Sequence, residues 1–307
     1  MKSIVLTGAT GPVGVALIKE CVRNGIRVIA FVRPSSAKIG RVPVSDLVTV
    51  LECDNNMLGD FDTVDYVTSP PDVFYHFAWG RTDKQFGLNS TEEQVKNIPH
   101  TLGAVRLAKR MSCKKFVGAG SQAEYGCPSG PLSGATPANP EIAYGVAKYA
   151  AGKLAKIECE KLNLEYVWVR ILSVFGVNNN DDTLINKFIF NCMNNHPMAL
   201  GPCTHIWDYL YEDDAGRALT AVGDRGASGK VYCLGSGAGR PLKEYLEVIK
   251  NMVNPAYVPG YGEIPYSEKS VKYLCADISE LTADTGWKPE VPFEEGIGRI
   301  VREMRGG

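Results

Sequence analysis

The chain has 307 residues, of which 45% are hydrophobic and 22% charged, and its formal net charge is −1. This length suits one large domain or a domain with a smaller lobe, and the balanced charge argues against a nucleic-acid partner. Nine cysteines without a Cys-x-x-Cys pair argue against a disulfide framework or a bound metal and indicate thiols in a reducing compartment. With no signal-peptide pattern and no apolar run near ~20 residues, we expect a cytoplasmic protein that has no membrane partner.

The first expected strand, residues 3–7, ends in a glycine-rich turn that leads into a helical stretch at 15–24. Gly8 permits a tight turn, Gly11 lets the backbone approach a phosphate, and Gly14 lets the helix and the strand pack closely. The free N–H groups at the start of the helix favour a pyrophosphate. This segment therefore predicts a dinucleotide-binding site.

Short β-branched runs alternate with helical patterns along the first half of the chain. The expected strands are 3–7, 28–32, 47–53, 73–77, 115–119 and 166–171. Long helices are expected at about 92–112, where Thr91-Glu-Glu-Gln94 forms a capping box, and at about 141–162. This alternation predicts an α/β fold, a Rossmann-like doubly wound parallel sheet with right-handed crossovers.

The second expected strand is followed by Arg33 and Ser35. NAD sites place an acidic residue here to accept a hydrogen bond from the ribose 2′-hydroxyl, whereas an arginine can pair with the 2′-phosphate of NADP. We therefore predict NADP(H) as the preferred cofactor, with Ser35 as a neighbouring donor and NAD(H) as the alternative.

Two Tyr-x-x-x-Lys patterns overlap in the second long helix. Tyr144 and Lys148 share one face, whereas Tyr149 and Lys153 lie about 140° further round, so both pairs cannot face one ligand. An adjacent ammonium lowers the pKa of a tyrosine, near ~10 when free, towards a range useful for proton transfer. We favour Tyr144 and Lys148, because the start of this helix approaches the top of the sheet and Lys148 can reach a ribose hydroxyl there. Ser121 follows the fifth expected strand and is placed to hydrogen-bond a substrate carbonyl.

After Gly176 the chain becomes richer in polar loops, short helical pieces and Pro/Gly stretches. We expect residues 1–173 to form the dinucleotide-binding domain. Residues 174–307 are expected to form a smaller substrate-binding lobe over the carboxyl ends of the strands, where ligands bind in such sheets. The segment 207–235 is expected to return to the main sheet.

Motifs spread over the whole chain resemble those of the extended short-chain dehydrogenases/reductases, in the epimerase/dehydratase branch that acts on nucleotide sugars. The matching residues are Gly8, Gly11, Gly14, Asp54-Asn55, Phe77-Ala78-Trp79, Asn97-x-x-x-Thr101, Ser121-x-x-x-Tyr125-Gly126, Tyr144-x-x-x-Lys148, Arg170, Gly176, Trp207-Asp-Tyr-Leu-Tyr211, Asp214, Asp277 and Gly286-Trp-Lys-Pro289. The resemblance implies that Tyr144 is the acid/base, that Lys148 sets its pKa and binds ribose, and that Ser121 orients the reacting carbonyl.

The glycine motif and the resemblance together imply contacts to both cofactor and substrate. The expected cofactor contacts are Gly8, Thr10, Gly11, Pro12, Val13, Gly14, Arg33, Ser35, Asp54, Asn55, Phe77, Ala78, Trp79, Asn97, Lys148 and Ile171. The expected substrate contacts are Arg81, Gln122, Glu124, Tyr125, Ser173 and Trp207.

The resemblance also implies a homodimer, because the two long helices pair across the dimer in the family. Their apolar residues would suit such an interface, although an intrachain core would have the same pattern. These residues are Val105, Leu107, Ala108, Ala150, Ala151 and Leu154.

The residues after Ser121 reduce the number of reactions that the resemblance allows. The resembling 4,6-dehydratases carry Asp-Glu where this chain has Gln122 and Ala123, and the 3,5-epimerase-reductases carry a cysteine at the position of Ala123. We therefore expect a reductase of the 4-keto group of a nucleotide-activated sugar, in keeping with an exchangeable NADP at Arg33. A C4-epimerase with tightly bound NAD is the alternative.

Several expected substrate-binding residues differ from those of the resembling family, and these differences leave two further functions open. Trp207 stands where many family members have a diphosphate-binding arginine, Ser173 replaces an asparagine, and Lys269 or Lys272 would have to compensate. A reductase of a smaller aldehyde or ketone is therefore a further alternative, and a non-catalytic NADP-sensing regulator is a remote one.

Overall fold

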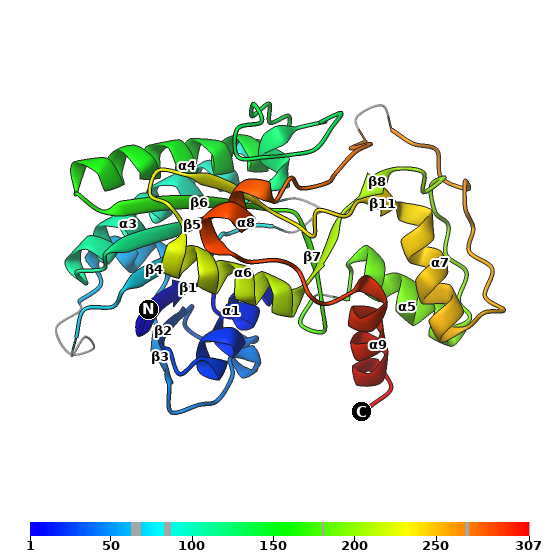
Figure 1. Ribbon diagram of the computed structural model, residues 1–307, viewed down its shortest axis with the longest axis horizontal. Coiled ribbons are helices and arrows are strands. Elements are labelled where there is room, and N and C mark those ends of the chain that lie inside the picture. The colour runs from blue at the N-terminus through cyan, green and yellow to red at the C-terminus, as the bar shows by residue number, and fades with distance from the viewer. Residues whose placement is uncertain (63–68, 83–86, 180, 268–269, 307) are drawn as a thin grey trace.

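The computed structural model describes residues 1–62, 69–82, 87–179, 181–267 and 270–306 (Figure 1). Within these residues, seven parallel strands form the main sheet in the order β10-β6-β5-β4-β1-β2-β3. They are β1 (Ser3–Thr7), β2 (Arg27–Val32), β3 (Val48–Glu52), β4 (Val73–His76), β5 (Lys115–Ser121), β6 (Glu165–Ile171) and β10 (Val231–Leu234). The predicted doubly wound sheet is confirmed. The strand order reverses between β1 and β4, which creates the crevice where ligands bind in such sheets.

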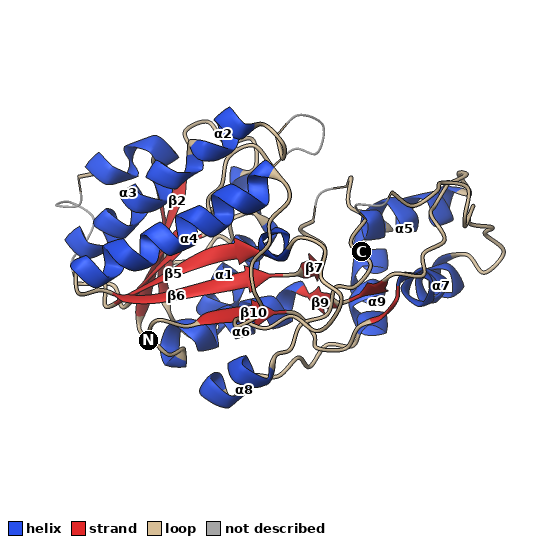
Figure 2. Ribbon diagram, turned by 90° about the horizontal axis from the view of Figure 1, so that it is seen from above, coloured by secondary structure: helices blue, strands red, loops and turns tan. Residues whose placement is uncertain are grey.

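Helices cover both faces of this sheet (Figures 1 and 2). On one face lie α1 (Pro12–Arg23), α6 (Glu212–Arg225) and α8 (Ser279–Thr285). On the other lie α2 (Thr91–Val95), α3 (Asn97–Arg110) and α4 (Ala143–Lys161). Short 3₁₀ turns follow β2, β3 and β5, namely η1 (Ile39–Arg41), η2 (Asn55–Asp60) and η3 (Gln122–Tyr125).

The helix predicted at 92–112 is divided at Lys96 into α2 and α3. The predicted capping box at Thr91 is wrong by one residue. The N-cap is Ser90, whose side chain accepts a hydrogen bond from the N–H of Glu93 at 3.4 Å. This register turns Gln94 inward, where its side chain is fully buried.

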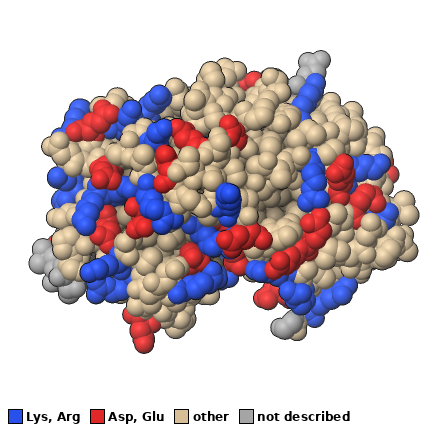
Figure 3. Space-filling model, in the orientation of Figure 1, with Lys and Arg blue, Asp and Glu red and all other residues tan. Residues whose placement is uncertain are grey.

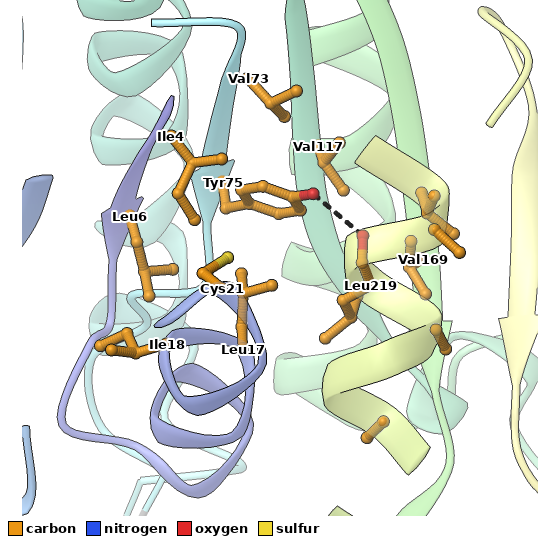
Figure 4. Packing of buried hydrophobic residues seen from close by; sticks show 14 of the residues in the cluster. Ile4, Leu6, Leu17, Ile18, Cys21, Val73, Tyr75, Val117, Val169 and Leu219 are labelled. Carbon is orange, nitrogen blue, oxygen red and sulfur yellow. Dashed lines mark hydrogen bonds between the residues drawn. The ribbon is translucent and has the colours of Figure 1, made fainter. Parts of the chain in front are cut away.

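Apolar side chains from α1 and α6 meet those of the sheet in one of the buried cores (Figure 4). Tyr75 lies at its centre, fully buried, and its hydroxyl donates to the carbonyl of Leu219 at 2.9 Å. This bond links β4 to α6 without leaving the phenol oxygen unpaired in an apolar interior, which would cost free energy.

The lobe lies beyond the carboxyl ends of the strands (Figure 2). Its elements are β7 (Ser173–Phe175), α5 (Leu184–Asn194), β8 (Ile206–Trp207), β9 (Tyr209–Tyr211), β11 (Arg240–Pro241), α7 (Leu242–Val253) and α9 (Phe293–Met304). β7 pairs with β9 in parallel, and β8 pairs with β11 in antiparallel fashion. Of the segment 207–235, β10 joins the main sheet and α6 covers it, whereas β8 and β9 belong to these small sheets.

The two long helices bury much of their apolar surface within the chain. Among the apolar residues considered for a dimer interface, four are fully buried in the intrachain core, which was the other interpretation of their pattern: Val105, Leu107, Ala108 and Ala151. Leu154 is 41% exposed, and it lies on the outer face of α4 with Val146 at 50% and Ile157 at 48%.

Charges of both signs are interspersed over the face that Figure 3 shows. Eight of the nine cysteines are buried and none is in a disulfide in the described chain, where Cys127 is the exposed one. None of the described helices combines the length and the apolar character that a bilayer crossing needs.

Glycines make room for a large side chain between α4 and the sheet. Trp168 of β6 is 2% exposed, and its indole packs against Gly118, Gly120 and Gly152. A Cβ on Gly152 would lie 2.8 Å from the indole, closer than real Cβ contacts. Close packing of α4 on β6 therefore depends on this glycine.

We expect Gly152→Ala to lower the free energy of unfolding by about 1–3 kcal/mol, because the methyl group overpacks the Trp168 site. Gly298→Ala is the matched control, since a Cβ there meets neighbouring atoms only at 3.6 Å or more. That change inside α9 should stabilise the protein by up to ~1 kcal/mol through helix propensity. Urea unfolding measures both, and equal effects of the two substitutions would contradict the proposed packing.

Candidate active site

A cavity of about 600 Å³ opens at the carboxyl ends of the strands around the crevice between β1 and β4. The predicted cofactor residues that line it are Gly8, Thr10, Gly11, Pro12, Val13, Gly14, Arg33, Asn55, Phe77, Ala78, Trp79, Lys148 and Ile171. The predicted catalytic and substrate residues that line it are Ser121, Tyr144, Arg81, Gln122 and Ser173. The structure thus gathers residues from seven separate segments around one space.

The glycine turn has the geometry that its sequence predicts. Gly8 has φ +78°, and its carbonyl accepts the N–H of Gly11 at 3.1 Å. A Cβ on Gly14 would collide with the carbonyl oxygen of Gly8. Gly11 is the N-cap of α1, and in the described chain no side chain caps this turn. The first turn of α1 therefore lines the cavity with backbone and fits a pyrophosphate.

Ser121 and Tyr144 both line the wall of the cavity. Ser121 is the last residue of β5, and its Oγ accepts the N–H of Ala123 at 3.2 Å. Tyr144 lies in the first turn of α4, and its N–H donates to the carbonyl of Leu88 at 2.9 Å. Burial raises the pKa of Tyr144, and the nearby Ser121 side chain opposes that rise.

Lys148 lies one turn further along α4 and is 4% exposed. Its Nζ donates to the carbonyl of Ala119 at 2.8 Å and lies 5.9 Å from the ring centroid of Tyr144. Burial lowers the pKa of Lys148 to about 7, while Glu124 acts in the opposite direction. The lysine can therefore gain or lose its proton near neutral pH.

The second Tyr-Lys pair lies elsewhere. Tyr149 and Lys153 line a separate cavity of about 210 Å³ between α4, β6 and residues 134–138. The Nζ of Lys153 is 5.4 Å from the ring centroid of Tyr149. The glycine turn thus shares its cavity with Tyr144 and Lys148 and not with this second pair.

The predicted substrate residues Glu124 and Tyr125 lie outside the lining of the main cavity. The carboxylate of Glu124 is buried and accepts from the N–H of Ser121 at 2.9 Å, from Trp168 Nε1 at 3.0 Å and from Arg170 Nε at 2.8 Å. Ser121 and Glu124 form a reciprocal capping box at η3. The Tyr125 hydroxyl donates to the carbonyl of Ser133 at 2.7 Å. Both side chains therefore support the wall of this cavity and do not line it.

Four other predicted residues also lie outside the lining. Asn97 is buried and accepts the N–H of Gly80 at 2.6 Å, so it fixes the segment after β4. Ser35 and Asp54 are exposed, the former in the turn after β2 and the latter before η2. Trp207 Nε1 donates to Ser173 Oγ at 2.7 Å and so reaches the cavity through a lining residue.

Of the two lysines predicted as compensating diphosphate contacts, the structure describes Lys272. Lys269 lies outside the described residues. Lys272 is exposed and does not line the cavity, and its carbonyl accepts the N–H of Ile206 at 3.1 Å.

Sequence reasoning missed two residues at the site. Lys38 lines the cavity together with Arg33. A second cation five residues after Arg33 could have indicated this role in the sequence. Gln94 accepts from Trp79 Nε1 at 2.8 Å and donates to the carbonyls of Arg81 and Gly87 at 2.7 and 2.8 Å. Its place in an apparent capping box concealed this role.

The lining has a strong charge bias. Among the described residues around the cavity, the cationic side chains are Arg33, Lys38, Arg81 and Lys148, and there is no aspartate or glutamate. Such a space attracts anionic ligands with several phosphate groups.

A model of the NAD dependent epimerase/dehydratase family matches residues 4–235. UDP-glucuronic acid decarboxylase 1 of Arabidopsis thaliana is 24% identical, over 98% of this chain and 69% of that protein. The dTDP-4-dehydro-6-deoxyglucose reductase of Escherichia coli is 23% identical, over 98% of this chain and 97% of that protein. The crystal structure of UDP-glucose 4-epimerase from Thermotoga maritima has a TM-score of 0.86 at 21% identity, over 99% of this chain and 98% of that one.

Proposed function

The chain belongs to the NAD-dependent epimerase/dehydratase family, and from this premise we propose that it reduces the 4-keto group of a nucleotide-activated deoxysugar with NADPH. It is an NAD-dependent enzyme of the short-chain dehydrogenase/reductase type. The observation that carries the proposal is the gathering of Ser121, Tyr144 and Lys148 around the cavity of the glycine turn. The similarity to a dTDP-4-dehydro-6-deoxyglucose reductase supports the choice of a 4-keto substrate.

The chemistry follows from these three side chains. When bound, NADPH would supply the hydride that C4 of the sugar receives. Tyr144 donates its proton to the oxygen at C4, which completes the alcohol, and Ser121 hydrogen-bonds that oxygen. Lys148 stabilises the tyrosinate that remains and can donate to a ribose hydroxyl. The negative phosphates of a bound dinucleotide favour the charged form of Lys148, whose pKa burial otherwise lowers to about 7.

Two cations support a preference for the phosphorylated cofactor. Arg33, directly after β2, and Lys38, directly before η1, both line the cavity and are exposed enough to meet a 2′-phosphate. Residues after Ser121 support reduction over dehydration, since Gln122 lines the cavity as a neutral amide. A reductase that exchanges its cofactor after each turnover fits this set better than an epimerase that retains NAD.

A homodimer through the outer faces of α3 and α4 is part of the proposal. The outer face of α4 carries Val146, Leu154 and Ile157, each between 41% and 50% exposed. A two-fold axis would place these apolar residues against their copies.

We expect Ile157→Glu to convert a dimer to a monomer, because it places a charge in the proposed apolar interface. Sedimentation equilibrium measures this change, and a wild-type protein that is already a monomer would contradict the interface.

We expect Tyr144→Phe to reduce turnover roughly 10²-fold or more, because the proton donor is removed, while cofactor affinity is retained. Tyr149→Phe is the matched control, since it removes a phenol from the same helix at the separate cavity, and it should change turnover little. Steady-state kinetics with the same substrate compares them. The reverse order of effects would assign the chemistry to the second pair.

We expect Arg33→Ala to weaken NADPH binding by roughly 10-fold or more, because a charge-assisted contact to the 2′-phosphate is lost. The affinity for NADH should stay the same, since NADH lacks that phosphate. Titration calorimetry with both cofactors measures the two values. Tighter binding of NADH by the wild type, or unchanged NADPH binding in the variant, would contradict this cofactor preference.

The overall reaction is tested with the purified protein, NADPH and a panel of nucleotide-activated 4-keto-6-deoxy sugars. One NADPH should be consumed for each sugar reduced, and UDP-glucose should not be converted to UDP-galactose. A protein that carries firmly bound NAD and equilibrates these two sugars, without net change in nicotinamide absorbance, would be an epimerase. Reduction of small aldehydes or ketones alone would replace the sugar substrate with a smaller carbonyl.

A further inference from the structure

The indole of Trp79 lies between the cavity and α2 and contacts both residues of the Tyr-Lys pair. The Nζ of Lys148 is 3.8 Å from the centroid of this indole, which is within the range of a cation–π interaction. The ring of Tyr144 meets the same indole edge to face, with the centroids 6.1 Å apart. The indole of Trp79 thus restricts the positions of both the Lys148 ammonium and the Tyr144 ring.

The plane of this indole is set by a fully buried amide. Gln94 Oε1 accepts from Trp79 Nε1 at 2.8 Å, and its Nε2 donates to the carbonyls of Arg81 and Gly87. These three bonds use the acceptor and both donors of the amide, so it cannot rotate without leaving a buried polar group unpaired. One turn later, Asn97 holds the N–H of Gly80 at 2.6 Å, next to Trp79 in the chain.

The neighbourhood of Lys148 explains why an aromatic face suits it. In the described part of the chain, Lys148 forms no ion pair, and Glu124 is already bonded to Ser121, Trp168 and Arg170. A carboxylate beside Lys148 would stabilise its charge but would also repel the phosphates of a dinucleotide. An indole face attracts the ammonium without adding a negative charge to the cavity.

We propose that Trp79 and Gln94 are positioning residues: Gln94 fixes the indole, and the indole holds the ammonium of Lys148 beside Tyr144 and free to donate to the cofactor. This inference deepens the proposed function and rests on it for its effect on turnover. Its effect on the proton affinity of Lys148 does not depend on the substrate.

The test measures the titration of Lys148 in protein labelled with ¹³C-lysine and free of cofactor, with the signal assigned by its loss in Lys148→Arg. Trp79→Leu removes the aromatic face, so the titration midpoint should fall by about half a pH unit or more. Trp79→Phe keeps a ring and should shift it less. Gln94→Met releases the indole while leaving Trp79 intact, and its shift should lie between those two.

Kinetics then separates positioning from folding. The basic limb of the pH–rate profile should move to lower pH in the same order as the Lys148 midpoints, with turnover reduced roughly 3- to 10-fold at neutral pH. Midpoints equal to wild type in all three variants would overturn the inference even if the protein reduces 4-keto sugars. If Trp79→Leu does not fold, the Phe and Met variants decide the question. Shifted midpoints in a protein that reduces no such sugar would overturn the proposed function and retain the link between Trp79 and Lys148.

Discussion

The buried ion pair between Glu124 and Arg170 fixes the edge of the sheet where the cavity opens. It joins η3, directly after β5, to the neighbouring strand β6 across 2.8 Å. The same carboxylate accepts the N–H of Ser121 and the indole N–H of Trp168. Removal of one partner would leave a charge buried and unpaired, which typically costs about 3–5 kcal/mol. The position of the Ser121 hydroxyl therefore depends on a bond that lies outside the cavity, and so does the register between β5 and β6 at this end.

Much of the fold was predictable, because buried parallel strands appear in the sequence as short β-branched runs. All six strands predicted in the first half are present, with ends displaced by two residues or fewer. The start of α2 was misplaced for a local reason. Both Ser90 and Thr91 are followed three residues later by Glu or Gln, so two capping registers are available from sequence. Tertiary structure selects Ser90, because only that register directs Gln94 towards Trp79.

The cofactor side and the substrate side of the site differ in how well they could be predicted from the sequence. The glycine turn and the Tyr144-Lys148 pair could be recognised from their spacing, and the structure brings both to one cavity. Ser121-x-x-Glu124 is also a capping box, a structural role that the sequence analysis did not assign to Glu124. In the described lining, Ser173 of β7 is the residue from the lobe, and Trp207 donates a hydrogen bond to it. Substrate contacts depend on how the lobe packs, which periodicity and spacing do not predict.

The Tyr75–Leu219 bond also has a consequence for the way the chain acquires its structure. It joins residues 144 positions apart, and the N-terminal amine pairs with Asp224 across 223 positions. The inner surface of α1 and one edge of β6 are covered only when α6 and β10 have been made, which follow β7, α5, β8 and β9 of the lobe in the chain. During synthesis on the ribosome, the residues of the glycine turn are therefore made long before α6, which packs against α1. Contacts of such long range slow folding and expose apolar surface meanwhile, so the emerging N-terminal half is the segment that a chaperone would meet first.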